Sequence, residues 1–145
     1  MSSAAFTLTE VMMSLSILTV VFAGVVGTYV QTSYRAEWSG YSLAAQALSI
    51  QQLEQAKSAV WDTRSYPVKN ELTNIAAVSA AVLDIPISGT NLVWATNYVT
   101  IAPLNLSTNP PVTVYFVRVD TVWPFRWRKT TRYHTNSVAN YMAPD

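Results

Sequence analysis

The stretch FTLTEVMMSLSILTVVFAGVVGTYV, residues 6–30, decides the fold of this chain. No residue from Val11 to Tyr34 is charged. As a helix, Val11 to Val30 would be about 30 Å long, which matches the hydrocarbon core of a bilayer. The small residues Ser2 to Ala5 precede the apolar run instead of following it, which disfavours a cleavable secretory signal. The sequence therefore predicts a membrane-spanning helix.

This helix is expected to continue through residues 35–61, which contain no proline and one glycine. Apolar residues recur there every three or four positions and predict a stripe that covers a sheet. The stripe consists of Leu43, Ala47, Ile50, Leu53 and Val60. Within the apolar half, Gly24 and Gly27 each weaken the helix by up to about 1 kcal/mol and allow another helix to approach closely. They are candidate points of helix softening.

Beyond Trp61 the pattern changes to that of strands. Asn91 to Ile101 and Val112 to Val122 are rich in valine, threonine and aromatic residues, and the breaker cluster Ser107 to Pro111 separates them. We expect two antiparallel strands in a small head formed by residues 62–145.

Three further segments complete the expected head. Trp123-Pro124-Phe125 is expected to turn the chain, and Arg128 to Tyr141 to return as the last strand. Leu72 to Leu83 is alanine-rich, and its pattern fits a short helix or a strand.

The composition argues against catalysis. The chain has no cysteine and one histidine, His134, so thiolate chemistry is excluded and no nucleophile, base and acid set can be assembled with its scattered carboxylates. Asp84 and Asp120 lack the neighbouring carboxylates of a calcium loop. Charged residues make up 12% of the chain, about half the usual share, and the net charge is +1. We expect no enzyme activity, no cofactor and no metal site.

The residues from Phe6 onward carry a resemblance to a known family. FTLTEVMMSLSILTVV resembles the N-terminus of type IV pilins, with a phenylalanine, a glutamate four positions later and then an apolar helix. In that family a prepilin peptidase cleaves before the phenylalanine and methylates its amino group. The resemblance implies cleavage between Ala5 and Phe6, N-methylation of Phe6, and residues 1–5 as a leader remnant. Ala5 stands where the family nearly always has glycine.

Glu10 is the residue on which assembly would depend. A carboxylate at the edge of an apolar span costs several kcal/mol unless it is paired. In pilins the equivalent glutamate attracts the N-terminal amine of a neighbouring subunit, so the resemblance implies this role for Glu10. The alternative is that Glu10 lies in the headgroup region of an ordinary signal-anchor helix.

A second likeness lies near the C-terminus. YFVRVDTVWPF and RKTTRYHTNSVANYMAP are similar to the closing strands of minor pilins and pseudopilins of the PilV and GspI kind. Together the two likenesses imply an α+β pilin fold. Its expected parts are a transmembrane and filament-core helix over 6–34, an amphipathic half over 35–61 and a small head over 62–145.

The resemblance also implies a function and a location. The chain would be a structural subunit of a bacterial type IV pilus or of a type II secretion pseudopilus. It would sit in the inner membrane with its head in the periplasm and then enter a filament. Its implied partners are other pilin or pseudopilin subunits, the inner membrane and the prepilin peptidase.

The rival interpretation is a single-pass, membrane-anchored binding module that never polymerises. Its candidate is a segment in which basic residues alternate with aromatic ones, as in proteins that contact phosphates and stack on bases. The candidate nucleic-acid patch consists of Arg118, Arg126, Trp127, Arg128, Lys129 and Arg132. The competing explanation, which we favour, is a solvated hairpin with buried tryptophans, because strand alternation turns half of its aromatic side chains inward.

Overall fold

The structure is a computed structural model that describes residues 7–84, 92–109, 111–127 and 129–144. Its contacts divide the chain into two compact units, Met1–Glu37 and Trp38–Asp145. Of the residues singled out above, Ala5, Phe6, Asn91 and Arg128 lie outside the described residues.

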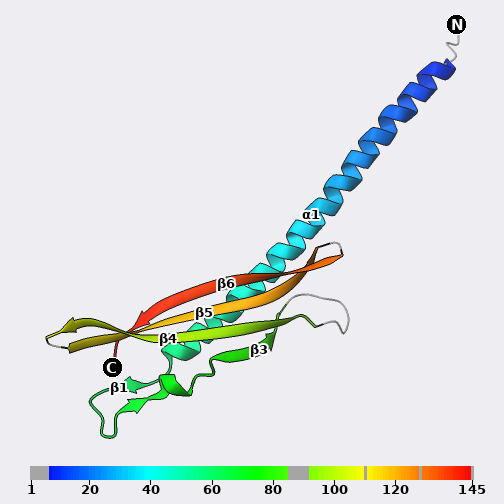
Figure 1. Ribbon diagram of the computed structural model, residues 1–145. Coiled ribbons are helices and arrows are strands. Elements are labelled where there is room, and N and C mark those ends of the chain that lie inside the picture. The colour runs from blue at the N-terminus through cyan, green and yellow to red at the C-terminus, as the bar shows by residue number, and fades with distance from the viewer. Residues whose placement is uncertain (1–6, 85–91, 110, 128, 145) are drawn as a thin grey trace. The chain divides into compact units, whose positions relative to one another are not determined.

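A single helix, α1, spans Leu8–Lys57, and its 50 residues correspond to about 75 Å (Figure 1). The long N-terminal helix is therefore confirmed, but the expectation that it reaches Trp61 is wrong. Trp61 lies in a short strand, β1 (Trp61–Asp62), and its ring packs edge-on against Tyr115 at 4.5 Å between centroids. The backbone of Val60 pairs with Glu71 through two hydrogen bonds of 3.0 Å. These tertiary contacts outweigh the helical propensity of residues 58–61.

The head contains a four-stranded antiparallel sheet with the strand order β3-β4-β5-β6. The strands are β3 (Val78–Val82), β4 (Trp94–Thr108), β5 (Pro111–Trp127) and β6 (Thr130–Met142). The antiparallel pair expected from the valine-rich segments is confirmed as β4 and β5, and the expected last strand is β6. The ambiguous segment from Leu72 to Leu83 contains the end of a 3₁₀ helix, η1 (Glu71–Asn74), and then β3. A separate two-stranded sheet pairs β1 with β2 (Lys69–Asn70).

The turn expected at Trp123-Pro124-Phe125 is wrong, because β5 continues through these residues to Trp127. The pairing between β4 and β5 ends at Thr96 and Val122, so beyond Val122 β5 pairs only with β6. A strand with one open edge tolerates a proline, because no ladder hydrogen bond is required on that side. Pro124 therefore stays in the strand, opposite Tyr133.

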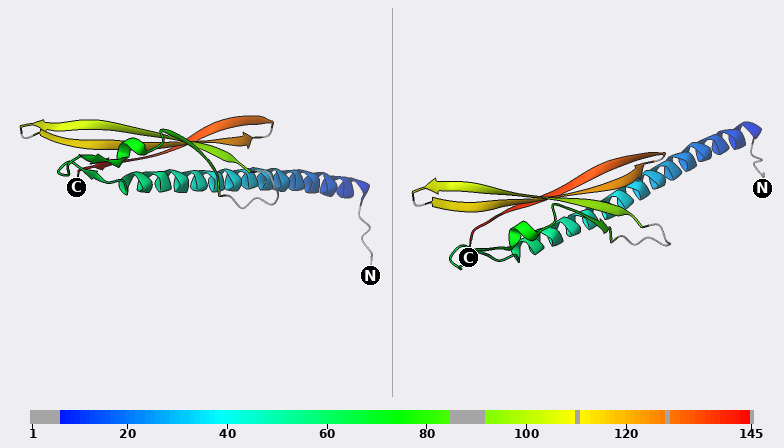
Figure 2. Two further views of the ribbon diagram at one scale, coloured as in Figure 1. Left: turned by 90° about the horizontal axis from the view of Figure 1, so that it is seen from below. Right: turned by 60° about the horizontal axis from the view of Figure 1, so that its bottom comes forward.

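One face of the sheet packs against the second half of α1 (Figures 1 and 2). One apolar cluster joins Ala45 of α1 to Trp123 and Phe125 of β5, and a second joins Leu53 and Ala56 to strand valines. The fold class is α+β, as expected: a long helix whose second half is covered by a small antiparallel sheet.

Polar side chains anchor the helix to this face. Trp123 is fully buried, and its Nε1 donates to Asn136 Oδ1 at 2.7 Å. Asn136 Nδ2 in turn donates to the backbone carbonyl of Ser42 at 3.3 Å. The chain of contacts runs from β5 through β6 to α1, so it fixes where the helix lies along the sheet.

The stripe that we expected to cover the sheet is largely wrong. The buried residues of α1 are Ala45, Ser49, Leu53 and Ala56. Of the expected stripe only Leu53 is among them, whereas Leu43 is 65% exposed and Ile50 is 45% exposed. Small side chains allow the helix backbone to lie close to the pleated sheet, and Ser49 satisfies its hydroxyl by donating to the Gln46 carbonyl at 2.9 Å. The buried face is still apolar, with Leu53 in one cluster and Leu48 packed against the other, but the small side chains on it allow the close approach.

Candidate functional site

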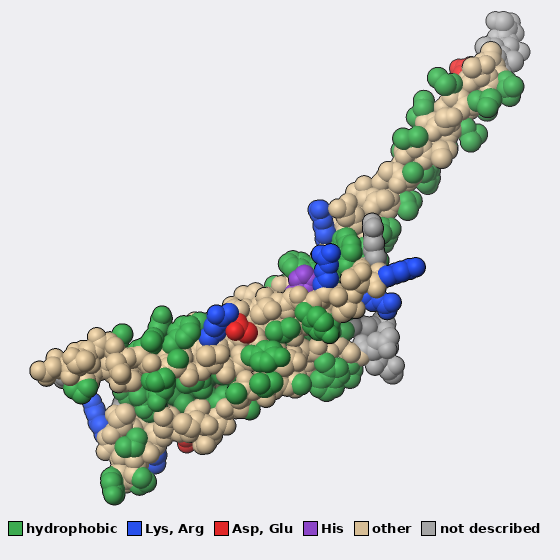
Figure 3. All heavy atoms as spheres, in the orientation of Figure 1, with side chains coloured by type: hydrophobic (Ala, Val, Ile, Leu, Met, Phe, Trp, Pro, Cys, Tyr) green, Lys and Arg blue, Asp and Glu red, His purple; other side chains and the backbone are tan. Residues whose placement is uncertain are grey.

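The first half of α1 exposes its apolar side chains on every side. All large hydrophobic residues from Leu8 to Val30 are between 46% and 78% exposed. Figure 3 shows hydrophobic side chains distributed along the visible face of this unit. Burying such side chains is worth about 1.5–3 kcal/mol each, so a helix of this composition requires an apolar environment that the described chain does not supply.

Three hydroxyl groups of this segment are satisfied within the helix. Ser16, Thr19 and Thr28 each donate to the carbonyl four residues earlier, at 2.8–2.9 Å. No donor therefore remains on these side chains to be desolvated, which removes the main cost of placing them in lipid or against another helix. Among the described residues, α1 is the one helix long and apolar enough to cross a membrane, and its most apolar window is entirely unburied.

Glu10 lies in the first turn of α1, and Thr7 precedes the helix, where its hydroxyl contacts the first turn as an N-cap does. The Thr7 hydroxyl accepts from the Glu10 backbone N–H at 3.3 Å, and the Thr7 carbonyl accepts from Val11 N–H at 3.2 Å. The spacing Thr7-x-x-Glu10 is that of a capping box, and a carboxylate here also favours the positive end of the helix dipole. Our sequence reasoning did not use this signal, although the spacing was visible.

The Glu10 side chain is exposed, and among the described residues its carboxylate makes no hydrogen bond or ion pair. The cap uses the backbone of Glu10 and leaves the charge available. Helix initiation and pairing with an external cation are thus compatible roles, and they can be separated by mutation.

Gly24 and Gly27 both lie within the regular hydrogen bonding of α1. A Cβ built on either would meet nothing within 4 Å. Whether they soften the helix stays a prediction, as does their use as a close-packing point for another helix.

Apolar exposure on α1 continues into its second half, on the side turned away from the sheet. Leu43 and Ile50 are exposed, and Ala47 lies between them at helical spacing. These are the members of the expected stripe that the sheet leaves uncovered. They form an outward-facing apolar strip on the helix.

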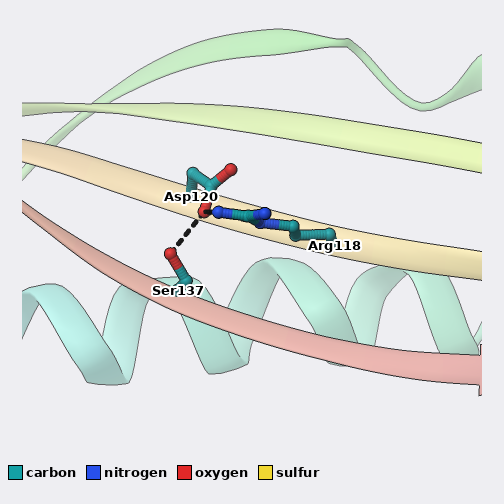
Figure 4. Close-up of polar contacts among 3 residues, drawn as sticks. All are labelled: Arg118, Asp120 and Ser137. Carbon is teal, nitrogen blue, oxygen red and sulfur yellow. Dashed lines mark hydrogen bonds and ion pairs between the residues drawn. The ribbon is translucent and has the colours of Figure 1, made fainter.

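Arg118 belongs to a polar cluster in the middle of the outer sheet face (Figure 4). Its Nε and Nη2 both lie 2.9 Å from Asp120 Oδ1, and Ser137 Oγ from β6 donates to the same oxygen. Partial burial alone would raise the pKa of the Asp120 carboxyl, but the hydrogen bonds from Ser137 and Arg118 and the charge of Arg118 outweigh burial, so its pKa lies below its ordinary value. Arg118 is therefore neutralised locally.

The other described members of the basic patch lie apart from Arg118. Arg126, Lys129 and Arg132 are exposed at the end of the sheet where β5 and β6 meet, and none forms an ion pair among the described residues. Arg118 is eight residues earlier in the same strand, about 27 Å from Arg126. The structure thus divides the expected patch into a neutralised arginine and a basic strand end. Trp127 is 37% exposed, and Trp123 is buried.

A shallow groove of about 540 Å³ lies between η1 and β4. Its described lining includes Leu72, Val99, Ile101 and Tyr115, and contributes no carboxylate, amine, guanidinium or imidazole. Asn70 Nδ2 donates to the Tyr115 hydroxyl there at 3.4 Å. The groove combines apolar side chains with the polar groups of Asn70 and Tyr115.

No protein-family model, curated protein or solved structure matches this chain. The long apolar N-terminal helix joined to an antiparallel sheet is consistent with a pilin-like fold and with a membrane anchor.

Proposed function

We propose that this chain is a structural subunit of a type IV pilin-like filament, a minor pilin or pseudopilin. The observation that carries the proposal is the exposure of the first half of α1, where the most apolar window has no residue buried within the chain. Such a helix fits the hydrocarbon core of a bilayer, and neighbouring helices can take the place of the lipid around it.

Assembly in this proposal transfers α1 from lipid to a bundle of like helices. The strip from Leu43 to Ile50 extends the apolar contact surface beyond the membrane-length segment. The sheet covers the opposite helix face, so subunit contacts and the folding of the head use different sides of the same helix. No catalytic step, cofactor or metal is part of the proposal.

Glu10 would set the position of each subunit by pairing with the N-terminal amine of a neighbour after cleavage before Phe6. Its uncommitted carboxylate and its place at the start of the apolar run support this role. An unpaired charge inside a helix bundle would cost several kcal/mol, so the pairing would strongly favour one axial register.

The matching location is the bacterial inner membrane, with the head in the periplasm before assembly and in the filament afterwards. The partners would be other pilin or pseudopilin subunits and the prepilin peptidase. The proposal covers a type IV pilus and a type II secretion pseudopilus alike.

The test is incorporation of full-length variants into filaments sheared from cells that supply an assembly system. Glu10→Gln keeps a capping-box residue at this position but removes the charge, so we expect a folded, membrane-bound protein that is missing from filaments. Glu37→Gln, an exposed acid on the same helix outside the apolar run, is the matched control and should assemble normally. Normal incorporation of Glu10→Gln would refute the pairing role.

The second candidate is a membrane-anchored module that binds nucleic acid, which the unpaired basic strand end favours. It predicts that replacing Arg126, Lys129 and Arg132 with glutamine abolishes salt-dependent DNA binding by the full chain in detergent. If the triple variant still enters filaments but no longer binds DNA, the two functions are separate.

A further inference from the structure

The strand β6 forms an open edge of the head sheet. It pairs with β5 alone, and no backbone hydrogen bond among the described residues reaches its other side. Half of the main-chain donors and acceptors along its 13 residues therefore point away from the sheet. Such an edge is a template for another strand unless the sequence blocks it.

The usual blocking devices are missing from β6. Its sequence contains no proline, its register with β5 has no bulge, and Arg132 is its one formally charged residue. The open edge of β4 beyond β3 differs, because it carries Pro103 and a register shift between Asn105 and Ser107. The part of β4 beyond β3 is thus protected, whereas β6 is available for pairing.

On the sheet face turned toward α1, side chains are more exposed on β6 than on β5. On β5 the residues that face α1, Thr121 and Val119, are buried. Their register partners on β6, Asn136 and Val138, face the same way but are only half-buried. Among the described residues, α1 contacts the inner face of β6, where Asn136 donates to the Ser42 carbonyl and the His134 ring lies 5.9 Å from that of Trp38, but it leaves these β6 side chains only half-buried.

The opposite edge, β3, has the direction that β6 requires in a partner. Four strands that alternate in direction give a sheet whose two edges run antiparallel to each other. A second copy of the chain in the same orientation would therefore place its β3 antiparallel to the first copy's β6. Copies anchored in one membrane cross it in the same direction, which permits such an orientation.

Charges at the two edges are complementary in this arrangement. Asp84 follows β3 and is exposed at the end of the sheet where Val82 pairs with Trp94. Lys129 and Arg132 are exposed at the same end, at the start of β6. Side-by-side copies bring this cationic end of β6 next to the neighbour's Asp84, whereas two β6 strands paired with each other would leave both cationic ends without that carboxylate.

We infer that the head binds a second copy of this chain by pairing the β6 edge with the β3 edge of its neighbour. The contact is head-to-tail, so it does not close on itself and extends the sheet from copy to copy. This inference rests on the proposed filament function in one respect, namely that the copies have the same orientation.

The register predicts which residues meet. Ala80, Thr96, Val122 and Thr135 form one row across the outer sheet face. If the row continues into the neighbour, Thr135 lies opposite Ala80 of the next copy, with Cβ atoms about 4.5–5.5 Å apart. A disulfide can bridge such a pair with a small adjustment.

The native chain contains no cysteine, so any disulfide must join the engineered positions. Full-length Thr135→Cys and Ala80→Cys chains with different tags are expressed together, and isolated membranes are oxidised mildly. We expect a disulfide-linked dimer that carries both tags, and a ladder of higher species from the chain with both substitutions. The matched control is Thr96→Cys, which lies in the same row on an interior strand and should not link to Thr135→Cys.

Two results would overturn the inference. Dimers of Thr135→Cys alone at the yield of the mixed pair would indicate a symmetric β6 contact, and a mixed yield no higher than that of the Thr96→Cys control would indicate random collision. Charge reversal at Lys129 and Arg132 to glutamate should lower the mixed yield several-fold, and Asp84→Lys in the partner should restore it.

The same membranes separate this contact from the proposed assembly role of Glu10. Cross-linking that persists in Glu10→Gln chains supports the edge contact even if those chains never enter a filament. Failure of the unmodified chain to enter filaments would refute the proposed function and leave the cross-linking result intact.

Discussion

The two halves of α1 differ in what they pack against, although they belong to one continuous helix. Residues from Leu8 to Val30 expose every large apolar side chain, whereas the second half buries Ala45, Ser49, Leu53 and Ala56 against the sheet. The second half is thus stabilised within its own chain. The first half has no such cover among the described residues, which is compatible with a membrane anchor. One helix therefore combines an exposed apolar half with a half that supports the head.

The largest expected effect comes from placing a charge in the first half. Leu18→Arg should reduce membrane association strongly, because an arginine at the centre of a span costs about 2.5–3.5 kcal/mol on insertion scales. Leu43→Arg, at a similarly exposed position in the second half, should remain in the membrane fraction. The measurement is resistance of each full-length chain to alkaline extraction, and equal extraction of both variants would remove the distinction between the halves.

An intermediate effect is expected where the helix meets the sheet. Ala45→Leu should destabilise the head by about 1–3 kcal/mol, because Ala45 is fully buried and a larger side chain would force the helix away from Trp123. The measurement is thermal unfolding of the full chain in detergent by near-ultraviolet circular dichroism.

Ala47→Leu is the control for that experiment, since Ala47 is exposed two residues further along the same helix. It should change stability by less than about 0.5 kcal/mol. If Ala47→Leu proved as harmful as Ala45→Leu, the face assigned to the sheet would be wrong.

The smallest expected effect concerns pH. The pKa of Asp120 is lowered in the folded head, so its contribution to stability is present above the unfolded-state pKa of about 3.9 and is lost as the pH falls through the lower folded value. Asp120→Asn should remove this part of the acid dependence, at a cost of about 1 kcal/mol or less at neutral pH. Unfolding of both chains followed from pH 7 to pH 2 would test it, and an acid dependence unchanged in Asp120→Asn would contradict it.

The parts of the fold that sequence reasoning recovered are those governed by local pattern. An uncharged run of helix length predicts α1, and valine, threonine and aromatic residues predict β4 and β5. The ends of these elements depend on distant partners, and so were predicted less well. Trp61 leaves the helix for Tyr115, and Pro124 stays in a strand because one side of β5 is unpaired there.

The buried face of α1 was the main error, and its cause is physical. Hydrophobic periodicity favours Leu43 and Ile50, but a helix that lies close to a sheet requires small side chains such as Ala45 and Ala56 at the contact. The basic patch was a candidate single site, disfavoured against a solvated hairpin, because its residues are near in sequence. An extended strand separates Arg118 from Arg126, and Asp120 neutralises the former.

The mass of the N-terminus of the chain recovered from its native cells tests the central claim most directly. The proposed filament role predicts a chain that begins at Phe6 with a methylated amino group, both in membranes and in sheared filaments. A chain that retains residues before Phe6, carries no methyl group and is recovered from membranes alone would contradict it and favour a permanent anchor.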